Sequence, residues 1–255
     1  MDLIFDTIID YKYGLIIAGV LIVIIILNQG KSNDEPIKDN IKWNQHYYIN
    51  LDHRTDRKEM ATKELKKIGI NNPNRFPAVK DEHHGGIGCG WSHTNVLKNA
   101  KENNWDYVII MEDDIKFYDP EETIQKINNV FNSEINWDVL IIGSKIENPI
   151  EKVNDDCVYA KGGVCATIMY IVKNHYYDTL INLWTESMDN FKNEFIKHGN
   201  RKMDIKYKDS IYHKYAIDQQ WKKLQKKDKF LLITPNKVYE NPGHSDIWES
   251  HTNNN

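Results

Sequence analysis

Three adjacent carboxylates, Glu112, Asp113 and Asp114, directly follow an apolar run, Val108–Met111, in the stretch "DYVIIMEDDIKF". Like charges repel one another, and a carboxylate that is buried without a partner costs several kcal/mol. A strand that leaves the core into a solvated acidic turn would explain the triplet without any function. Carboxylate oxygens are also the ligands that hard divalent cations prefer, so a cation site is the functional alternative.

A second group of charged residues follows another predicted strand. The stretch "NLDHRTDR" places Arg54 and Arg57 just beyond the strand at 46–51, and "GSK" follows the strand at 137–143. In open α/β sheets, ligands gather beyond the carboxyl ends of the strands. Arginine binds phosphate through its fork of N–H groups, and carboxylates hold a cation that neutralises the same phosphates. The pattern indicates a diphosphate bridged to a metal, although each feature alone also fits a solvated surface.

The alternation of strand-like and helical patterns predicts the elements that position these residues. Apolar and β-branched runs predict strands at 46–51, 75–79, 106–111, 137–143, 165–172 and 229–235. Helical periodicity predicts helices at 52–70, from near Ser92, and at 119–131, 174–197 and 212–227. We therefore expect an α/β fold with a mixed, mostly parallel central sheet flanked by helices.

The N-terminal segment predicts a membrane anchor. "GLIIAGVLIVIIIL", Gly14–Leu27, has no polar residue and is extended by its neighbours toward the roughly 20 residues that a span needs. A cleaved signal peptide is the alternative, but it would start with basic residues, whereas Asp2, Asp6 and Asp10 precede this segment. We expect one transmembrane helix at 14–28 and a single-pass protein of an endomembrane or viral membrane, with the side of the membrane left open.

The remaining boundaries and the composition complete this division. We expect a flank at 1–13, a linker at 29–42, a catalytic domain at 43–250 and a disordered tail at 251–255. The formal net charge of −4 over 255 residues gives no polyanion-binding signature, so no nucleic-acid partner is expected. The three cysteines have neither disulfide-framework nor zinc-site spacing, although a Cys157–Cys165 bridge stays open.

An ordered set of stretches resembles glycosyltransferase family 25, which includes lipopolysaccharide sugar transferases and procollagen galactosyltransferases, and also members carried by giant DNA viruses. The matching stretches are "YYINLDHRTDRKEMATKELKKIGI", "GGIGCGWSHTNVLKNA", "WDYVIIMEDDIKF", "WDVLIIGSK", "ATIMYIVKNHYYDTL", "YAIDQQW" and "PGHSDI". Together they extend from Gln45 to Trp248. The residues Gly90-Trp91 and "YAIDQQW" depart from the family pattern, which leaves the acceptor less certain than the donor.

The resemblance implies a GT-A-like single domain, a UDP-hexose donor, and Mn²⁺ or another divalent cation. It implies metal ligation by Asp114, with Glu112 or Asp113 assisting, and by His244 in "PGHSDI". The residues expected to bind the nucleotide sugar are Asn50, Leu51, Arg54, Arg57, Ser92, His93 and Asp113. For Ser92 and His93 the structural alternative is a helix cap and a histidine that satisfies a backbone group.

The implied reaction moves galactose or glucose to a hydroxyl acceptor, either hydroxylysine of a collagen-like protein or a glycan. If the anomeric centre inverts, a carboxylate must lie within hydrogen-bond reach of the acceptor hydroxyl. Asp218 matches the family's aspartate in that region and is the candidate base, with an ordinary exposed helical aspartate as its alternative. Two other functions stay open: a non-catalytic nucleotide-sugar or glycan-binding module, and another metal-dependent enzyme such as a phosphodiesterase.

Overall fold

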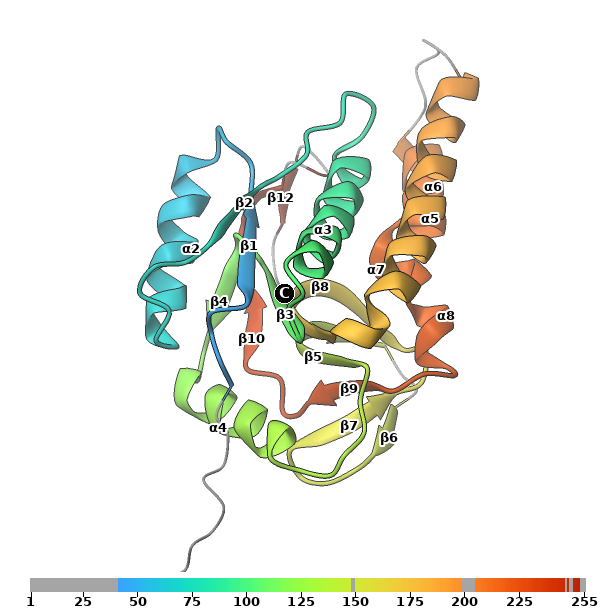
Figure 1. Cartoon of the computed structure of the whole chain (residues 1–255). Coiled ribbons are helices and arrows are strands. Elements are labelled where there is room, and N and C mark those ends of the chain that lie inside the picture. The colour runs from blue at the N-terminus through green and yellow to red at the C-terminus, as the bar shows by residue number, and fades with distance from the viewer. Residues whose placement is uncertain (1–40, 148–149, 199–204, 246, 248–249, 253–255) are drawn as a thin grey trace, which may run out of the picture. The chain divides into compact units, whose positions relative to one another are not determined.

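The computed structural model describes residues 41–147, 150–198, 205–245, 247 and 250–252, which belong to one compact unit that begins at Asn40 (Figure 1). Its centre is an eight-stranded sheet with the strand order β2-β1-β3-β8-β5-β9-β7-β6. The strands are β1 (His46–Asn50), β2 (Arg75–Pro77), β3 (Tyr107–Glu112), β5 (Val139–Ile146), β6 (Ile150–Lys152), β7 (Cys157–Ala160), β8 (Val164–Lys173) and β9 (Phe230–Ile233). Strands β7 and β8 run against the others, so the sheet is mixed, as expected.

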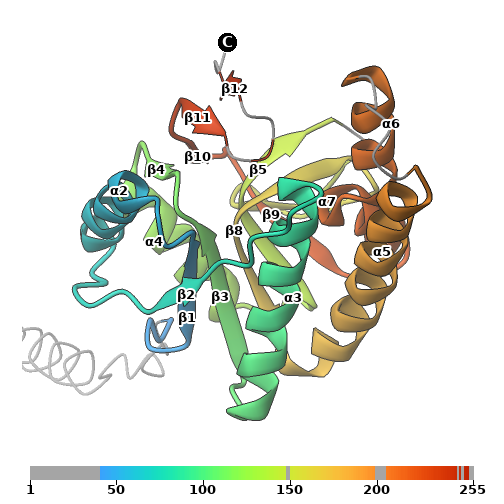
Figure 2. The same cartoon turned by 90° about the horizontal axis from the view of Figure 1, so that it is seen from above.

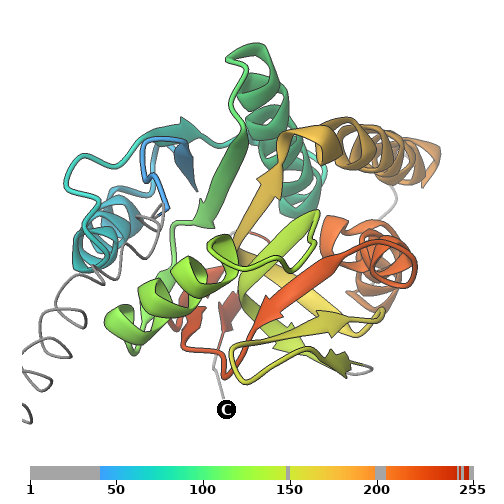
Figure 3. The same ribbon diagram turned by 60° about the horizontal axis from the view of Figure 1, so that its bottom comes forward.

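Helices cover both faces of this sheet, as Figures 2 and 3 show. Strand residues alternate between the faces: Val108 and Ile110 of β3 join one apolar cluster, and Ile109 and Met111 join the other. The first cluster includes residues of α3 (Gly85–Glu102), α5 (Tyr177–His198), α6 (Ile205–Tyr215), α7 (Ile217–Gln220) and α8 (Lys222–Gln225). The second includes residues of α2 (Thr55–Lys67) and α4 (Pro120–Phe131).

Two short antiparallel pairs complete the described fold. Strand β4 (Ile115–Phe117) leaves the acidic turn and pairs with β10 (Val238–Glu240). Strand β11 (Gly243–Ser245) pairs with β12 (Ser250–Thr252). A single-turn 3-10 helix, η1 (Asn174–Tyr176), leads into α5. The β4–β10 pair matters for the site because it places the segment after Lys237 beside the acidic turn.

The Gly-rich stretch before Ser92 is helical, which corrects the predicted helix start. Helix α3 begins at Gly85, and the His84 side chain accepts a hydrogen bond from the Gly86 N–H. A Cβ at Gly88 would lie 2.3 Å from the Val79 carbonyl oxygen, and one at Gly90 would lie 2.1 Å from Met188 Sδ. The glycines therefore let neighbouring segments approach the helix closely, and this packing outweighs their low helix propensity.

The predicted helix at 212–227 is also divided in the structure. Ala216 has an extended ψ of 139°, which separates α6 from α7, and α8 follows as a further short helix. Asp218 consequently lies in the first turn of the four-residue α7 rather than in the middle of a long helix.

The prediction of a transmembrane helix, and with it of a single-pass protein in an endomembrane or viral membrane, is wrong for the part of the chain that the structure describes. Over residues 41–147, 150–198 and 205–252 with their gaps, no helix is both long and apolar enough to cross a bilayer. Helix α5, with 22 residues, has the length, but charged side chains such as Asp189 and Lys192 interrupt its sequence. The predicted anchor and membrane contact at 14–28 lie outside the described residues.

Candidate active site

The acidic triplet lies where β3 ends and the chain turns into β4. Glu112 is the last residue of β3, and Asp113 and Asp114 form the turn. Strand β1 runs parallel to β3 with Ile49 opposite Glu112, so Asn50 leaves β1 beside the turn. The carboxyl ends of the parallel neighbours β1 and β3 therefore bring together the polar residues that were predicted to follow these two strands.

Asp113 is engaged through both of its carboxylate oxygens. Asn50 Nδ2 donates to Asp113 Oδ2 at 2.8 Å, and Arg57 Nη1 lies 2.9 Å from Asp113 Oδ1. Arg75 in turn donates to the side-chain and backbone oxygens of Asn50, both at 2.8 Å. Asp113 therefore fixes the exit of β1 and the start of α2 against the end of β3.

Asp114 has one paired and one unpaired oxygen. Arg57 Nη1 lies 3.0 Å from Asp114 Oδ2, whereas Asp114 Oδ1 is buried and has no hydrogen-bond partner among the described residues. Burial raises the pKa of Asp114 to about 6 against the opposing effect of Arg57, and the charges of Asp113 and Glu240 add to the increase. A buried carboxylate oxygen without a hydrogen-bond partner is suited to bind a cation.

Glu112 points to the other side of the turn, toward β8 and α3. Thr167 Oγ1 donates to Glu112 Oε1 at 2.6 Å, and His93 Nε2 lies 3.7 Å from the same oxygen. Burial, followed by the charge of Asp114, raises the pKa of Glu112 to about 8. Burial also lowers the pKa of His93 to about 3, so the imidazole is neutral, and its Nδ1 lies 2.8 Å from the Tyr170 hydroxyl.

Asp218 reaches the same region from α7. Its Oδ2 accepts a hydrogen bond from the Ala166 N–H at 3.0 Å, and its Oδ1 is buried without a partner among the described residues. Ala166 has a φ of +65°, a left-handed conformation that is unusual for a residue with a Cβ. Because Thr167 is the next residue and binds Glu112, a two-residue segment of β8 links Asp218 to the acidic turn.

A lysine and a further glutamate border the acids. Lys145 Nζ, after the buried part of β5, lies 3.2 Å from Glu240 Oε2 of β10. The Asn241 N–H donates to the Asp114 carbonyl oxygen, so the end of β10 lies directly beside the turn. "GSK" marked Lys145 in the sequence, whereas Glu240 and Thr167 carried no signal. Glu240 lies beyond the last predicted strand at 229–235, and Thr167 lies inside the strand predicted at 165–172.

Three other predicted site residues lie in or beside different elements: Ser92 in α3, Arg54 just before α2 and Leu51 just after β1. Ser92 is buried, accepts from the Val79 N–H and donates to the Gly88 carbonyl oxygen, so it holds the segment before α3. Arg54 pairs with Asp56 at 2.7 Å near the start of α2. Leu51 is half-buried just after β1.

The two histidines that were predicted as site residues lie in different elements, His93 in α3 and His244 in β11. His93, at 1% exposure, lies beneath Glu112 and contacts side chains of the core. His244 lies in β11 opposite His251, and its role as a metal ligand stays a prediction. Within the described part of the chain, no three His, Cys, Asp or Glu side chains converge as a complete metal-ligand set.

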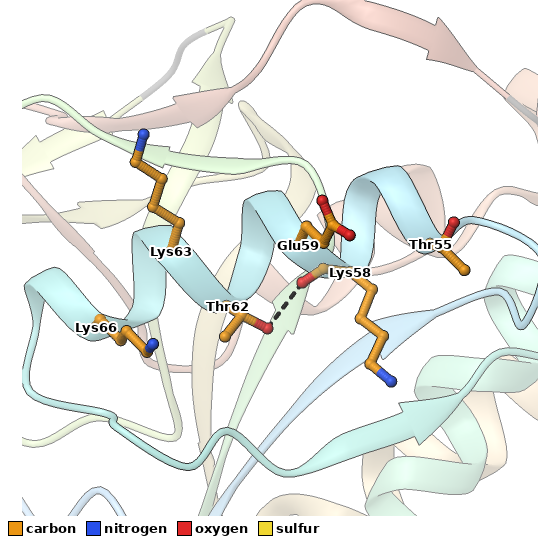
Figure 4. A pocket seen from close by; sticks show the side chains of 6 residues that line it. All are labelled: Thr55, Lys58, Glu59, Thr62, Lys63 and Lys66. Atoms are coloured by element: carbon orange, nitrogen blue, oxygen red, sulfur yellow. Dashed lines mark hydrogen bonds between the residues drawn. The ribbon is translucent and has the colours of Figure 1, made fainter.

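A separate surface hollow lies along α2 (Figure 4). Its lining residues share one face of the helix and are Thr55, Lys58, Glu59, Thr62, Lys63 and Lys66. Thr62 Oγ1 donates to the Lys58 carbonyl oxygen at 2.8 Å, a local helical contact. None of the predicted site residues lines this hollow, which is the solvent-facing side of the helix that carries Arg57.

Fold and site together define an α/β protein with a carboxylate cluster at the carboxyl ends of two neighbouring parallel strands. Comparison with known families then finds a similarity to glycosyltransferase family 25 over part of this chain. The match to the model of "Glycosyltransferase family 25 (LPS biosynthesis protein)" covers residues 83–190, which include the acidic triplet. The family resemblance predicted from the sequence motifs is confirmed.

Individual proteins are similar over part of the chain. "Procollagen galactosyltransferase 1-A" of Xenopus laevis is 25% identical over 150 residues, which cover 47% of this chain and 24% of that protein. The match thus spans about a quarter of that relative's length. The crystal structure of A197 from STIV has a TM-score of 0.40 at 10% identity and covers 76% of this chain and 81% of that one. A glycosyltransferase involved in the glycosylation of the major capsid of PBCV-1 has a TM-score of 0.35 at 9% identity, over 74% and 91% of the two chains.

Proposed function

We propose that this domain transfers a hexose, galactose or glucose, from a UDP-sugar to a hydroxyl acceptor with the help of a divalent cation. The observation that carries the proposal is the acidic turn with its unpaired, buried Asp114 Oδ1 beside Arg57. A cation and an arginine in one place suit a nucleotide diphosphate, because each neutralises phosphate oxygens. The family model that residues 83–190 match is a glycosyltransferase family, which supports the proposal.

The residues present fit a divalent cation such as Mn²⁺. Asp114 Oδ1 is a buried oxygen donor without a partner among the described residues, and Glu112 supplies a second carboxylate from the same turn. We assign Asp114 as the first ligand, with Glu112 and Asp113 assisting, and Asp113 also holds Asn50 and Arg57 in place. When bound, the cation would stabilise the negative charge of the leaving diphosphate as a Lewis acid.

The chain's own residues would perform four tasks in the reaction. Arg57 binds the diphosphate, and Asn50 keeps the β1 exit rigid through its bond to Asp113. Asp218 Oδ2 accepts a hydrogen bond from the Ala166 N–H. The other oxygen, Oδ1, is therefore left to accept the proton of the acceptor hydroxyl. His93, neutral and buried, supports Glu112 from below without adding charge.

For the acceptor we propose hydroxylysine of a collagen-like protein ahead of a glycan. A matched relative bears the name procollagen galactosyltransferase, and the similarity covers 24% of it. The outcome expected for an acceptor hydroxyl activated by Asp218 is inversion at the anomeric carbon, which gives a β-linked hexose.

The Asp114→Ala variant tests the cation site. We expect Mn²⁺-dependent turnover of UDP-galactose or UDP-glucose to fall below detection while the far-ultraviolet circular dichroism spectrum stays unchanged. Asp114 Oδ1 has no described partner, and Arg57, which pairs with Oδ2, keeps its contact with Asp113. Ser133→Ala, which removes a hydroxyl at the end of α4, is a control for mutation at a distant site. Full Mn²⁺-dependent activity in Asp114→Ala would contradict the assignment.

A further inference from the structure

A single nitrogen of Arg57 lies between two carboxylates of the acidic turn. Arg57 Nη1 is 2.9 Å from Asp113 Oδ1 and 3.0 Å from Asp114 Oδ2. The three side chains are between 10% and 13% exposed, so this contact is largely shielded from water. A cation held by Asp113 and Asp114 would therefore meet the positive charge of Arg57 at the same carboxylates.

The two acids differ in how firmly they are held. Asp113 is fixed through its second oxygen by Asn50, which Arg75 fixes in turn. Asp114 has its second oxygen buried without a partner among the described residues. Arg57 has the longest side chain of the three residues in this contact, so its guanidinium can reach more than one partner from α2.

We propose that Arg57 and the divalent cation compete for Asp113 and Asp114, and that the diphosphate of the donor ends this competition by giving Arg57 a new partner. The inference rests on the proposed function and adds an order of binding to it. A cation that displaces Arg57 by itself removes the contacts of a largely buried guanidinium with Asp113 and Asp114, which is unfavourable. A diphosphate offers phosphate oxygens that suit the same guanidinium.

The competition predicts weak binding of the cation alone and strong coupling between cation and nucleotide. Couplings between two ligands commonly change affinity by about 5–150-fold, and the effect is reciprocal. Direct contact between cation and diphosphate also produces coupling, with or without Arg57. The quantity that isolates Arg57 is therefore the affinity for the cation in the absence of nucleotide.

The experiment is calorimetric titration of Mn²⁺ into the full chain, without nucleotide and with saturating UDP. We expect Arg57→Gln to bind Mn²⁺ alone about tenfold more tightly than wild type and to gain less from UDP. Lys145→Gln is the matched control, because it removes the same charge from the edge of the cluster but pairs with Glu240 rather than with Asp113 or Asp114. Lys145 is 61% exposed, so its loss should change Mn²⁺ affinity by less than about threefold.

Unchanged or weaker binding of Mn²⁺ alone by Arg57→Gln would overturn the proposal, as would equal tightening in Lys145→Gln, which would reduce the effect to net charge. If Arg57→Gln fails to fold by circular dichroism, Arg57→Lys provides the same comparison, with a shorter side chain and a smaller expected tightening. A wild-type chain that binds neither Mn²⁺ nor UDP would refute the proposed function itself. If the wild-type chain binds both Mn²⁺ and UDP, and Arg57→Gln leaves the affinity for Mn²⁺ unchanged, only the competition is refuted.

Discussion

Glu112→Gln should stabilise the cation-free protein at alkaline pH, because the wild-type site buries a carboxylate against its neighbours. Burial and the charge of Asp114 raise the pKa of Glu112 from 4.5 to about 8. The folded chain therefore keeps this proton after the unfolded chain has released it, so the free energy of unfolding falls as the pH rises from 4.5 to about 8. Glutamine can still accept the Thr167 hydrogen bond but carries no charge.

The size of the effect follows from the width of this pH interval. Each pH unit inside it lowers the stability by about 1.4 kcal/mol, so the whole interval corresponds to roughly 4–5 kcal/mol. The Glu112 side chain is 23% exposed, and contact with water reduces the cost. We therefore expect Glu112→Gln to exceed wild type by about 2–4 kcal/mol at pH 8.5 and to differ little at pH 5.

Urea unfolding of both proteins in EDTA, followed by circular dichroism at the two pH values, measures this difference directly. Added Mn²⁺ should narrow the gap at pH 8.5, because the cation stabilises wild type more than a variant that has lost a ligand. A stability difference that is the same at pH 5 and pH 8.5 would refute the reasoning, since only the ionised carboxylate carries the cost.

Three further variants test other parts of the site and fold. Asp218→Asn should bind UDP and Mn²⁺ normally yet lose transfer by a factor of about 10²–10⁴ in single-turnover assays; undiminished transfer would reassign Asp218 to holding Ala166. Thr167→Val should weaken Mn²⁺ binding several-fold by calorimetry, with Thr167→Ser restoring it, because the hydroxyl orients Glu112; equal loss in both would point to packing instead. Gly88→Ala should lower the free energy of unfolding by about 1–3 kcal/mol in urea, since its Cβ would lie 2.3 Å from the Val79 carbonyl oxygen, and an unchanged midpoint would contradict this packing.

The sequence predicted the parts of the site that depend on local pattern. The apolar run before Glu112 predicted a buried strand, and the rule for strand ends brought Arg57 and the acidic turn together. Parallel pairing of β1 with β3 supplies the physical reason, because it aligns the two carboxyl ends. The sequence could not predict that one nitrogen of Arg57 contacts both Asp113 and Asp114, since that depends on side-chain geometry.

Longer-range features of the site depended on tertiary packing. Asp218 reaches Ala166 only because a break at Ala216 turns α7 toward β8, and helical periodicity gave no sign of that break. Helix α3 begins earlier than predicted because close packing at Gly88 and Gly90 favours a helix despite the glycines. The apolar N-terminal segment lies outside the described residues, and no described helix is both long and apolar enough to cross a membrane.

The most direct test of sugar transfer by this domain is the release of UDP from UDP-galactose and UDP-glucose by the wild-type chain. It should be measured with a hydroxylysine-containing peptide or a glycan as acceptor, in Mn²⁺ and in EDTA. We expect one of the two donors to be turned over in Mn²⁺, an acceptor to increase the rate and carry the hexose, and EDTA to abolish the reaction. No release of UDP from either donor in Mn²⁺, from a chain that is folded by circular dichroism, would contradict the proposed function.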